Sequence, residues 1–155
     1  PIKDYDLPVV FVDYCDARSY CADQGKHLCG RIGGVAGGWI ITNPDLDEWM
    51  NACVGPSKTT YPYGNNYDAT KCLADTSPTS PPPERPGTHA GCVGGFPKVY
   101  DMVGNVYEWT EQCSAGDTYC SVRGDGVGAA GTRCDNTNSY PLLYRNTVTG
   151  FRCCR

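Results

Sequence analysis

The sequence predicts an α+β domain with little regular structure, in which disulfides take the place of a continuous sheet. Eleven cysteines are scattered over 155 residues and are not grouped in CxxC pairs, a density that indicates oxidised pairs. Two segments have helical patterning, whereas the other apolar stretches are short, aromatic or β-branched, and separated by Gly, Asn and Asp turns. With 40% hydrophobic residues, the chain can build one core, so we expect a single domain over residues 1–155.

Composition also limits the setting and the partners of the protein. The cysteine content indicates a secreted, extracellular protein. A net charge of −4 leaves no broad basic surface, so no nucleic-acid partner is predicted. No apolar run is long enough for a transmembrane segment. The chain opens at Pro1 without a signal peptide, so we expect it to be a processed product.

The first third of the chain is predicted to contain a strand and two helices. The β-branched run over residues 7–12 predicts a strand entered through a proline. Residues 16–23 are compatible with a helix that is capped by Asp13 or by its own first aspartate and is ended by Gly25. A second helix is expected over residues 43–53, with an asparagine cap and a proline in its first turn.

Glycines and prolines dominate the connecting segments. Residues 30–38 follow no clear strand and lack the lysine of a phosphate-binding loop, so they are predicted to form a flexible surface loop. Residues 61–67 should form turns, and residues 77–86 an extended surface loop. Short antiparallel strands are expected at Val99-Tyr100, Val106–Trp109, Ser121–Arg123, Thr132–Cys134 and Gly150–Cys153.

The segment from Val99 to Thr110 is the most informative part of the sequence. It places a Gly-Asn turn between two aromatic, apolar arms and carries Asp101 and Glu108. Two carboxylates, with carbonyls bent inward by such a turn, make an all-oxygen set that suits a hard cation such as calcium. The alternative is a structural turn in which Asp101 accepts backbone N–H bonds and Glu108 meets an arginine.

Other motifs give no catalytic or metal centre. His27 and His89 have no Cys, His or acidic partner at ligand spacing, so no zinc site is predicted. No Ser-His-Asp arrangement can be argued from order or spacing. Residues 123–125 spell Arg-Gly-Asp, an integrin-binding tripeptide, but three-residue motifs recur by chance and no adhesion through them is expected.

Seven blocks carry a resemblance that runs almost from end to end. The most specific is Tyr-Asp-Met-Val-Gly-Asn-Val-Tyr-Glu-Trp-Thr over residues 100–110, and the others are Pro8-Val9-Val10, Asp16–Ala22, Gly25–Leu28, Tyr61–Asn65, Val122-Arg123-Gly124 and Gly150–Cys153. In this order they resemble the formylglycine-generating enzyme (sulfatase-modifying factor) family. The resemblance implies a loop-rich relative of the C-type lectin fold, with the usual N-terminal part of the family domain absent from this chain.

The resemblance suggests a catalytic activity, but the residues that this activity requires are missing from the corresponding stretch of the chain. The family's founding activity is oxidation of a sulfatase cysteine to formylglycine with oxygen and a copper ion held by two cysteines, since soft thiolates suit Cu(I). The corresponding stretch here, Asp125 to Gly131, contains no cysteine. Cys134 matches the structural cysteine that follows this stretch in the enzymes. We therefore predict no catalytic residues and expect that the chain is not an enzyme.

The resemblance implies two disulfides and a calcium site. The family's structural disulfides carry over to Cys21–Cys153 and Cys53–Cys134. Its calcium ligands carry over to the side chains of Asp101 and Glu108 and to the backbone carbonyls of Gly104 and Val106. A second calcium site of the family has no match around residues 67–86.

Seven cysteines remain after these assignments. Locality favours Cys113 with Cys120, which flank a short turn, and Cys72 with Cys92, which bracket the proline-rich loop. Cys15, Cys29 and Cys154 are left, and three cysteines cannot all pair, so one is free or bridges to another segment or chain.

The sequence thus favours a secreted, non-catalytic module that is stabilised by disulfides and calcium and that serves binding or structure. Its partner would be a protein or a glycan. One alternative is an extracellular subunit that self-associates into a filament or surface layer, and another is a copper-dependent oxidase with rearranged thiols. The expected ligand-binding surface is polar and aromatic and includes Asp135, Asn136, Asn138, Tyr140, Tyr144 and Arg145.

Overall fold

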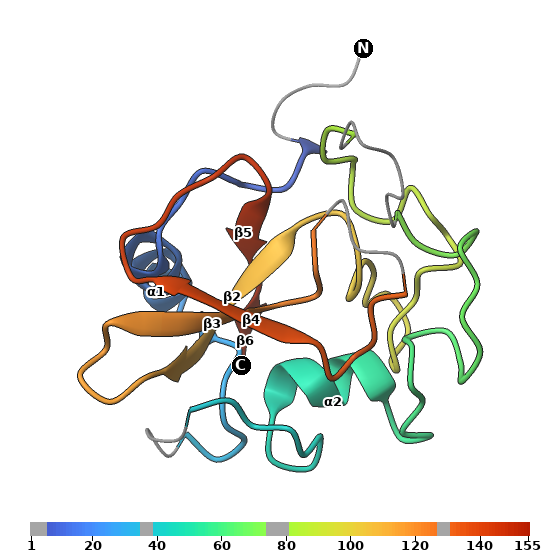
Figure 1. Cartoon of the computed structure of the whole chain (residues 1–155), viewed down its shortest axis with the longest axis horizontal. Helices are drawn as coiled ribbons and strands as arrows, with labels where there is room; N and C mark the ends of the chain where they lie inside the picture. Colours follow the sequence, from blue (N-terminus) through green and yellow to red (C-terminus); the bar gives the residue numbers. More distant parts are fainter. Residues whose placement is uncertain (1–5, 35–38, 74–80, 127–130) are drawn as a thin grey trace.

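The computed structural model of the chain describes residues 6–34, 39–73, 81–126 and 131–155. Within these ranges the elements follow the order α1 (Tyr14–Asp23), β1 (His27–Leu28), α2 (Glu48–Val54), β2 (Tyr107–Cys113), β3 (Tyr119–Arg123), β4 (Thr137–Pro141), β5 (Thr149–Phe151) and β6 (Cys153–Cys154). Figure 1 shows the strands gathered near the centre, α1 at one side, α2 below, and the long segment between α2 and β2 as loops at the other side. The predicted α+β class and loop-rich character are confirmed.

The strands form one four-stranded and one two-stranded sheet. The larger sheet has the order β4-β3-β2-β5, and the smaller pairs β1 with β6. Most pairs are antiparallel, as expected, but β2 and β5 run parallel, with Glu108 opposite Gly150. The parallel pair arises because the connection from β4 to β5 carries the chain across to the far edge of β2.

Helix α1 is fixed at both ends by local chemistry. Asp13 is its cap: the Asp13 carboxylate accepts the N–H of Asp16 at 2.9 Å, and the Asp16 carboxylate accepts the N–H of Asp13 at 3.3 Å, which together form a capping box. Arg145 adds ion pairs of 2.7 Å to both carboxylates. Gly25, at φ 66°, directs the chain away after the helix, as the sequence predicted.

The predicted strand over residues 7–12 is wrong. Phe11 has φ 61°, which is incompatible with extended backbone, and its N–H donates to the carbonyl of Asn146 at 2.9 Å. The carbonyl of Val12 accepts the indole N–H of Trp109 at 3.1 Å. The segment is therefore held by single contacts to distant parts of the chain and not by a ladder.

Helix α2 begins later than predicted. Asp47 is its cap and accepts the N–H of Met50 at 2.5 Å. Asn43, the predicted cap, instead accepts the N–H of Asp45 at 2.9 Å, which is a local turn before the helix. Of the other predicted strands, Val99-Tyr100 contributes only an isolated bridge to Val93, and residues 132–134 form no strand.

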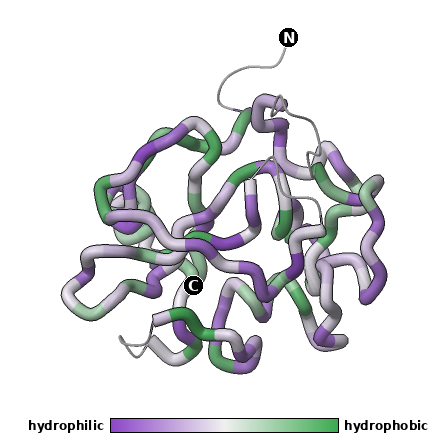
Figure 2. Tube along the Cα trace, in the orientation of Figure 1, coloured by the Kyte–Doolittle hydropathy of each residue, from purple (hydrophilic) through white to green (hydrophobic). Residues whose placement is uncertain are grey.

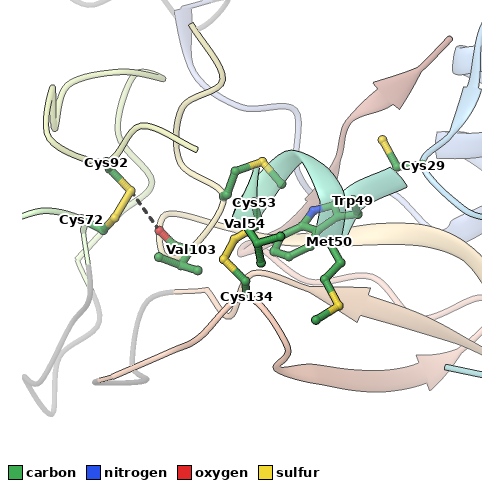
Figure 3. Close-up of a cluster of buried hydrophobic side chains, with 10 residues drawn as sticks. Cys29, Trp49, Met50, Cys53, Val54, Cys72, Cys92, Val103 and Cys134 are labelled. Atoms are coloured by element: carbon green, nitrogen blue, oxygen red, sulfur yellow. Dashed lines mark hydrogen bonds between the residues drawn. A yellow bond between two sulfur atoms is a disulfide. The ribbon is translucent and has the colours of Figure 1, made fainter. Parts of the chain in front are cut away.

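Among the described residues, two clusters of buried side chains make the core. One lies around Trp49 of α2 and contains the Cys53–Cys134 disulfide, as Figure 3 shows. The other joins α1 to the sheet around Trp109, whose ring meets that of Tyr14 edge-on at 6.2 Å. Figure 2 shows hydrophobic residues spread through loops as well as strands, so the core draws on irregular segments.

Five disulfides cross-link the chain. Four are the expected pairs Cys21–Cys153, Cys53–Cys134, Cys72–Cys92 and Cys113–Cys120. The fifth joins Cys29 to Cys154, and Cys15 is a free, exposed thiol on α1. Three of the five bridges link residues more than 80 positions apart.

Parts of two predicted loops lie outside the described residues, namely 35–38 of the glycine-rich loop and 77–80 of the proline-rich loop. In the portion of the chain that the structure describes, we find no helix with the length and apolar character that a bilayer crossing requires.

Candidate functional site

The turn at residues 99–108 borders a pocket of about 300 Å³. Three of the four predicted calcium ligands, Asp101, Val106 and Glu108, line this pocket, whereas Gly104 does not. The wall also contains Lys98, Tyr100 and Asn105 at the turn itself, and three distant segments complete it through Pro8, Pro86, Phe151 and Arg152. The pocket therefore unites segments from both ends of the chain around the motif that the sequence singled out.

Three left-handed residues shape the turn: Asp101, Gly104 and Asn105 have φ angles of 56°, 80° and 63°. Only glycine fits at 104, because a Cβ there would lie 2.2 Å from the carbonyl oxygen of Leu73. The Asn105 amide accepts the N–H of Glu84 at 2.9 Å and donates to the Glu84 carbonyl at 3.1 Å. These contacts hold the proline-rich loop against the turn and fix its shape.

Glu108 is the centre of a buried hydrogen-bond network. The Arg152 guanidinium donates from Nε to Oε2 and from Nη2 to Oε1, each at 2.5 Å, and the Trp49 indole N–H donates to Oε2 at 2.6 Å. Burial alone would lower the pKa of Arg152, but the charge of Glu108 and these hydrogen bonds outweigh it, so this pKa is raised. Glu108 thus meets an arginine, as in the alternative that the sequence left open.

Asp101 is held by backbone contacts. Its Oδ2 accepts the N–H of Gly87 at 2.7 Å. Burial raises the pKa of Asp101, while the Gly87 hydrogen bond and the charge of Arg152 partly oppose that rise. Arg152 also donates from Nη2 to the carbonyl of Tyr100 at 3.1 Å, so one guanidinium ties both ends of the motif together.

The residues present fit a hard cation in ligand type. An ionised carboxylate offers about four acceptor sites, and three bonds occupy those of Glu108, which leaves capacity on Oε1. The described residues contain no group of three or more His, Cys, Asp or Glu side chains able to hold a metal. An ion here would therefore need backbone carbonyls as ligands in addition to the side chains of Asp101 and Glu108. Arg152 would compete with the ion for the negative charge of these carboxylates.

Replacing Asp101 by asparagine is expected to stabilise the calcium-free protein at pH 7. The amide keeps the acceptor for Gly87 and tolerates the left-handed φ, but it removes a carboxylate whose pKa burial raises. As the pH falls through this raised pKa toward about 3.9, the pKa of an aspartate in the unfolded chain, the folded wild type takes up a proton. The difference in stability between the wild type and the variant then disappears. Urea unfolding of both proteins between pH 7 and 4 in chelator checks this. A wild type that loses stability relative to the variant on acidification contradicts it.

The structure brings no pair of thiols together. Cys134 is bonded to Cys53 with an S–S distance of 2.01 Å. Cys15 is the free cysteine and lies exposed on α1. Because Cu(I) sites of the formylglycine-generating kind need two thiolates, the cysteines of this chain do not fit copper.

Two residues of the predicted ligand-binding surface, Asn138 and Tyr140, lie in a strand, whereas the other four lie in the segments on either side of it. Residues 137–141 form β4, in which Asn138 lies opposite Val122 of β3. Tyr140 stacks on Tyr144 with 4.4 Å between ring centroids and meets Trp109 edge-on at 6.2 Å. The sequence did not predict this strand because polar residues on an edge strand resemble those of a loop.

The other residues of that surface have intramolecular partners. Asn136 donates to Asp125 at 3.1 Å. Asp135 forms an exposed ion pair with Arg133 at 2.9 Å, and Arg145 binds the cap of α1. These side chains therefore stabilise the fold whether or not they also contact a ligand.

The Arg-Gly-Asp tripeptide is not accessible through its arginine. Arg123 is fully buried, and its Nη2 lies 3.4 Å from the Asp47 carboxylate and donates to the carbonyl of Ile41. Its guanidinium also lies 5.8 Å from the ring centroid of Trp49. This agrees with the expectation that the tripeptide does not mediate adhesion.

Sequence reasoning missed the roles of Trp49 and Arg152 in the site. Both contact Glu108 from positions 59 and 44 residues away, so no local spacing could reveal them. The Gly-Phe-Arg-Cys block, which contains Arg152, is part of the family pattern and is therefore a sequence signal for this residue. The pattern alone assigns no role to the arginine.

Fold and site together define a disulfide-linked α+β module with an ion-paired, oxygen-rich pocket and no thiol centre. Residues 2–155 match the family model described as the sulfatase-modifying factor enzyme 1-like domain. The chain belongs to this family.

Individual relatives differ in how much of their length is matched. The bovine protein named inactive C-alpha-formylglycine-generating enzyme 2 is 34% identical over 113 residues, which cover 68% of this chain and 33% of the relative. The serine/threonine-protein kinase pkn1 of Chlamydia caviae is 31% identical over 113 residues, 72% of this chain and 15% of the relative. The chain thus spans a third or less of these relatives.

Solved structures share the fold. PvdO from Pseudomonas aeruginosa superposes with a TM-score of 0.65 at 21% identity, over 94% of this chain and 60% of that one. CarF gives a TM-score of 0.66 at 18% identity, over 96% and 67%. The fold expected from the sequence resemblance is therefore confirmed.

Proposed function

We propose that this chain is a secreted, non-catalytic binding or structural module of its family, stabilised by disulfides and by calcium. The observation that carries the proposal is the state of the cysteines: Cys134 is locked in a disulfide with Cys53, and residues 125–131 contain no cysteine. A thiolate pair for copper is therefore lacking. The bovine relative that is named inactive is in keeping with this.

A cross-linked scaffold suits a binding role. Five disulfides restrain a chain in which most residues are in loops, and loops on a rigid frame commonly carry recognition. The same bridges support the secreted setting, because disulfides of this density persist in oxidising compartments.

The purified chain, loaded with Cu(I) and given a sulfatase-type cysteine peptide, is expected to make no formylglycine. Oxidation would need a copper ion between two thiolates, and Cys134 in its disulfide cannot supply one. Mass spectrometry of the peptide measures the aldehyde. Copper-dependent aldehyde that disappears in Cys134→Ser would overturn the non-catalytic assignment.

Calcium is expected to raise the melting temperature and chelation to lower it. If the folded state alone binds the ion, a concentration 100 times the Kd adds about 2.7 kcal/mol of stability. Asp101→Asn should weaken this response, because it removes one of the two carboxylates that line the pocket among the described residues. Scanning calorimetry with calcium, magnesium or chelator provides the measurement, and a full calcium response in Asp101→Asn would move the site elsewhere.

Self-association is the second candidate, and one surface favours it. Val9, Phe11 and Leu143 are 59%, 60% and 71% exposed, and their segments are joined by the hydrogen bonds Phe11 N–H to Asn146 and Tyr14 N–H to Leu142. Exposed apolar side chains on adjoining segments are common at interfaces. Sedimentation analysis of the wild type and of Phe11→Ser distinguishes a monomer from an assembly that depends on this surface.

A further inference from the structure

A second hollow, of about 590 Å³, lies in the loop that follows α2, and no role has been assigned to it. It is an open surface hollow that is lined by residues between 63 and 71. A hairpin-like turn shapes the start of the loop, because Tyr61 and Gly64 exchange backbone hydrogen bonds of 2.8 and 3.2 Å. The hollow is thus built by one continuous segment.

Aromatic rings form a prebuilt wall of this hollow. Tyr61 lies against both lining tyrosines: its ring is stacked on Tyr63 at 5.5 Å with an interplanar angle of 8°, and it is tilted against Tyr67 at 5.8 Å. The Tyr63 hydroxyl accepts the N–H of Asp68 at 3.3 Å, and its ring packs on the core around Trp49. Tyr63 is therefore rigid, while Tyr67 stays 42% exposed and offers apolar ring surface to a ligand.

Fixed polar groups stand beside these rings. The Asn65 side-chain oxygen accepts from Thr60 N–H at 2.9 Å and from the Thr60 hydroxyl at 3.3 Å, so its amide nitrogen is oriented as a donor. Two hydrogen bonds from Thr70 hold Asp68 and lower the pKa of its carboxyl. Asp68 is thus a charged acceptor at neutral pH, and Lys71, which also lines the hollow, offsets its charge.

We propose that this loop binds a neutral saccharide through the rings of Tyr63 and Tyr67. The polarised C–H bonds on one face of a sugar ring match the negative face of an aromatic ring. Sugar hydroxyls can accept a hydrogen bond from the amide N–H of Asn65 and can donate one to the carboxylate of Asp68. The charges of Asp68 and Lys71 in the hollow offset each other, which favours an uncharged ligand, and the net charge of −4 disfavours an anionic one. The assignment rests on the proposed binding role and gives it a ligand class and a place.

The test uses uncharged oligosaccharides of glucose, mannose and N-acetylglucosamine, with a sulfated oligosaccharide as the charged probe. Titration of the isotope-labelled chain is followed by two-dimensional NMR, and affinity is measured by calorimetry. We expect at least one neutral saccharide to shift amide signals in residues 61–71, and the sulfated probe to leave them unchanged.

Variants then test the residues. Tyr67→Ala should weaken binding at least tenfold, Tyr67→Phe should keep it within threefold, and Asp68→Asn should weaken it. Tyr119→Ala removes an exposed tyrosine of β3, far along the chain from the loop, and is the matched control with unchanged affinity. Tyr67 is exposed, so its loss should leave the fold intact, and the NMR spectrum verifies this.

The inference is overturned if no neutral saccharide binds, if only the sulfated probe binds, if shifts map outside residues 61–71, or if Tyr67→Ala binds as well as the wild type. These failures are separable from failure of the proposed function, because the aldehyde assay tests the non-catalytic assignment without involving this loop.

Discussion

Replacing Arg152 by alanine is expected to lower the free energy of unfolding by about 3–5 kcal/mol in the absence of calcium. The substitution removes both guanidinium bonds to Glu108 and leaves a carboxylate that is only 6% exposed with the Trp49 indole as its remaining partner. An uncompensated charge in such a place is far more costly than the loss of a surface ion pair. Urea denaturation in chelator measures the loss.

Arg133→Ala is the matched control for this variant. Arg133 pairs with Asp135 at 2.9 Å, but both side chains are well exposed, so its removal should cost no more than about 1 kcal/mol. Calcium should restore part of the stability of Arg152→Ala, because the ion can replace the lost positive charge beside Glu108. A small loss in Arg152→Ala would show that Glu108 is adequately solvated, and an equal response of both variants to calcium would place the ion elsewhere.

Removing both the Cys21–Cys153 and the Cys29–Cys154 disulfides by serine substitutions is expected to cost about 5 kcal/mol, from the chain entropy of a loop of at least 125 residues. Both bridges must be removed, because either one alone keeps the two ends of this loop together. The matched control is the Cys113–Cys120 bridge, which closes only seven residues and should cost about 2.5 kcal/mol on the same basis. Chemical unfolding of the two variants compares these values. Similar losses for both would mean that native-state strain or residual unfolded structure, and not loop length, governs the contribution of the bridges.

Local signals in the sequence predicted local structure well. Asp13 and Gly25 mark the two ends of α1, because capping and left-handed glycine act within a few residues. The Gly104-Asn105 turn also forms as expected, and Asp101 accepts a backbone N–H at its start. Each of these features depends on chemistry that neighbouring residues supply.

Features that depend on distant partners could not be predicted. The β-branched residues before α1 favour a strand, but Phe11 is drawn into a left-handed conformation by its contact with Asn146. Residues 137–141 look like a recognition loop, yet pairing with β3 makes them a strand. Glu108 lines the pocket, but its partners Trp49 and Arg152 come from a helix and from the last residues of the sequence. Pairing of Cys29 with Cys154 was likewise left open.

The two bridges that tie Cys153 and Cys154 to Cys21 and Cys29 have a mechanical consequence. Tension applied to the chain outside these cysteines would be carried by the Cys21–Cys153 bond and not by the residues between Cys21 and Cys153. The 132 positions that separate these two cysteines could extend to about 460 Å at ~3.5 Å per residue without the bridge, and with it they stay folded. Placed in series with other parts of a larger assembly, such a module would act as a nearly inextensible link whose folded interior carries no load.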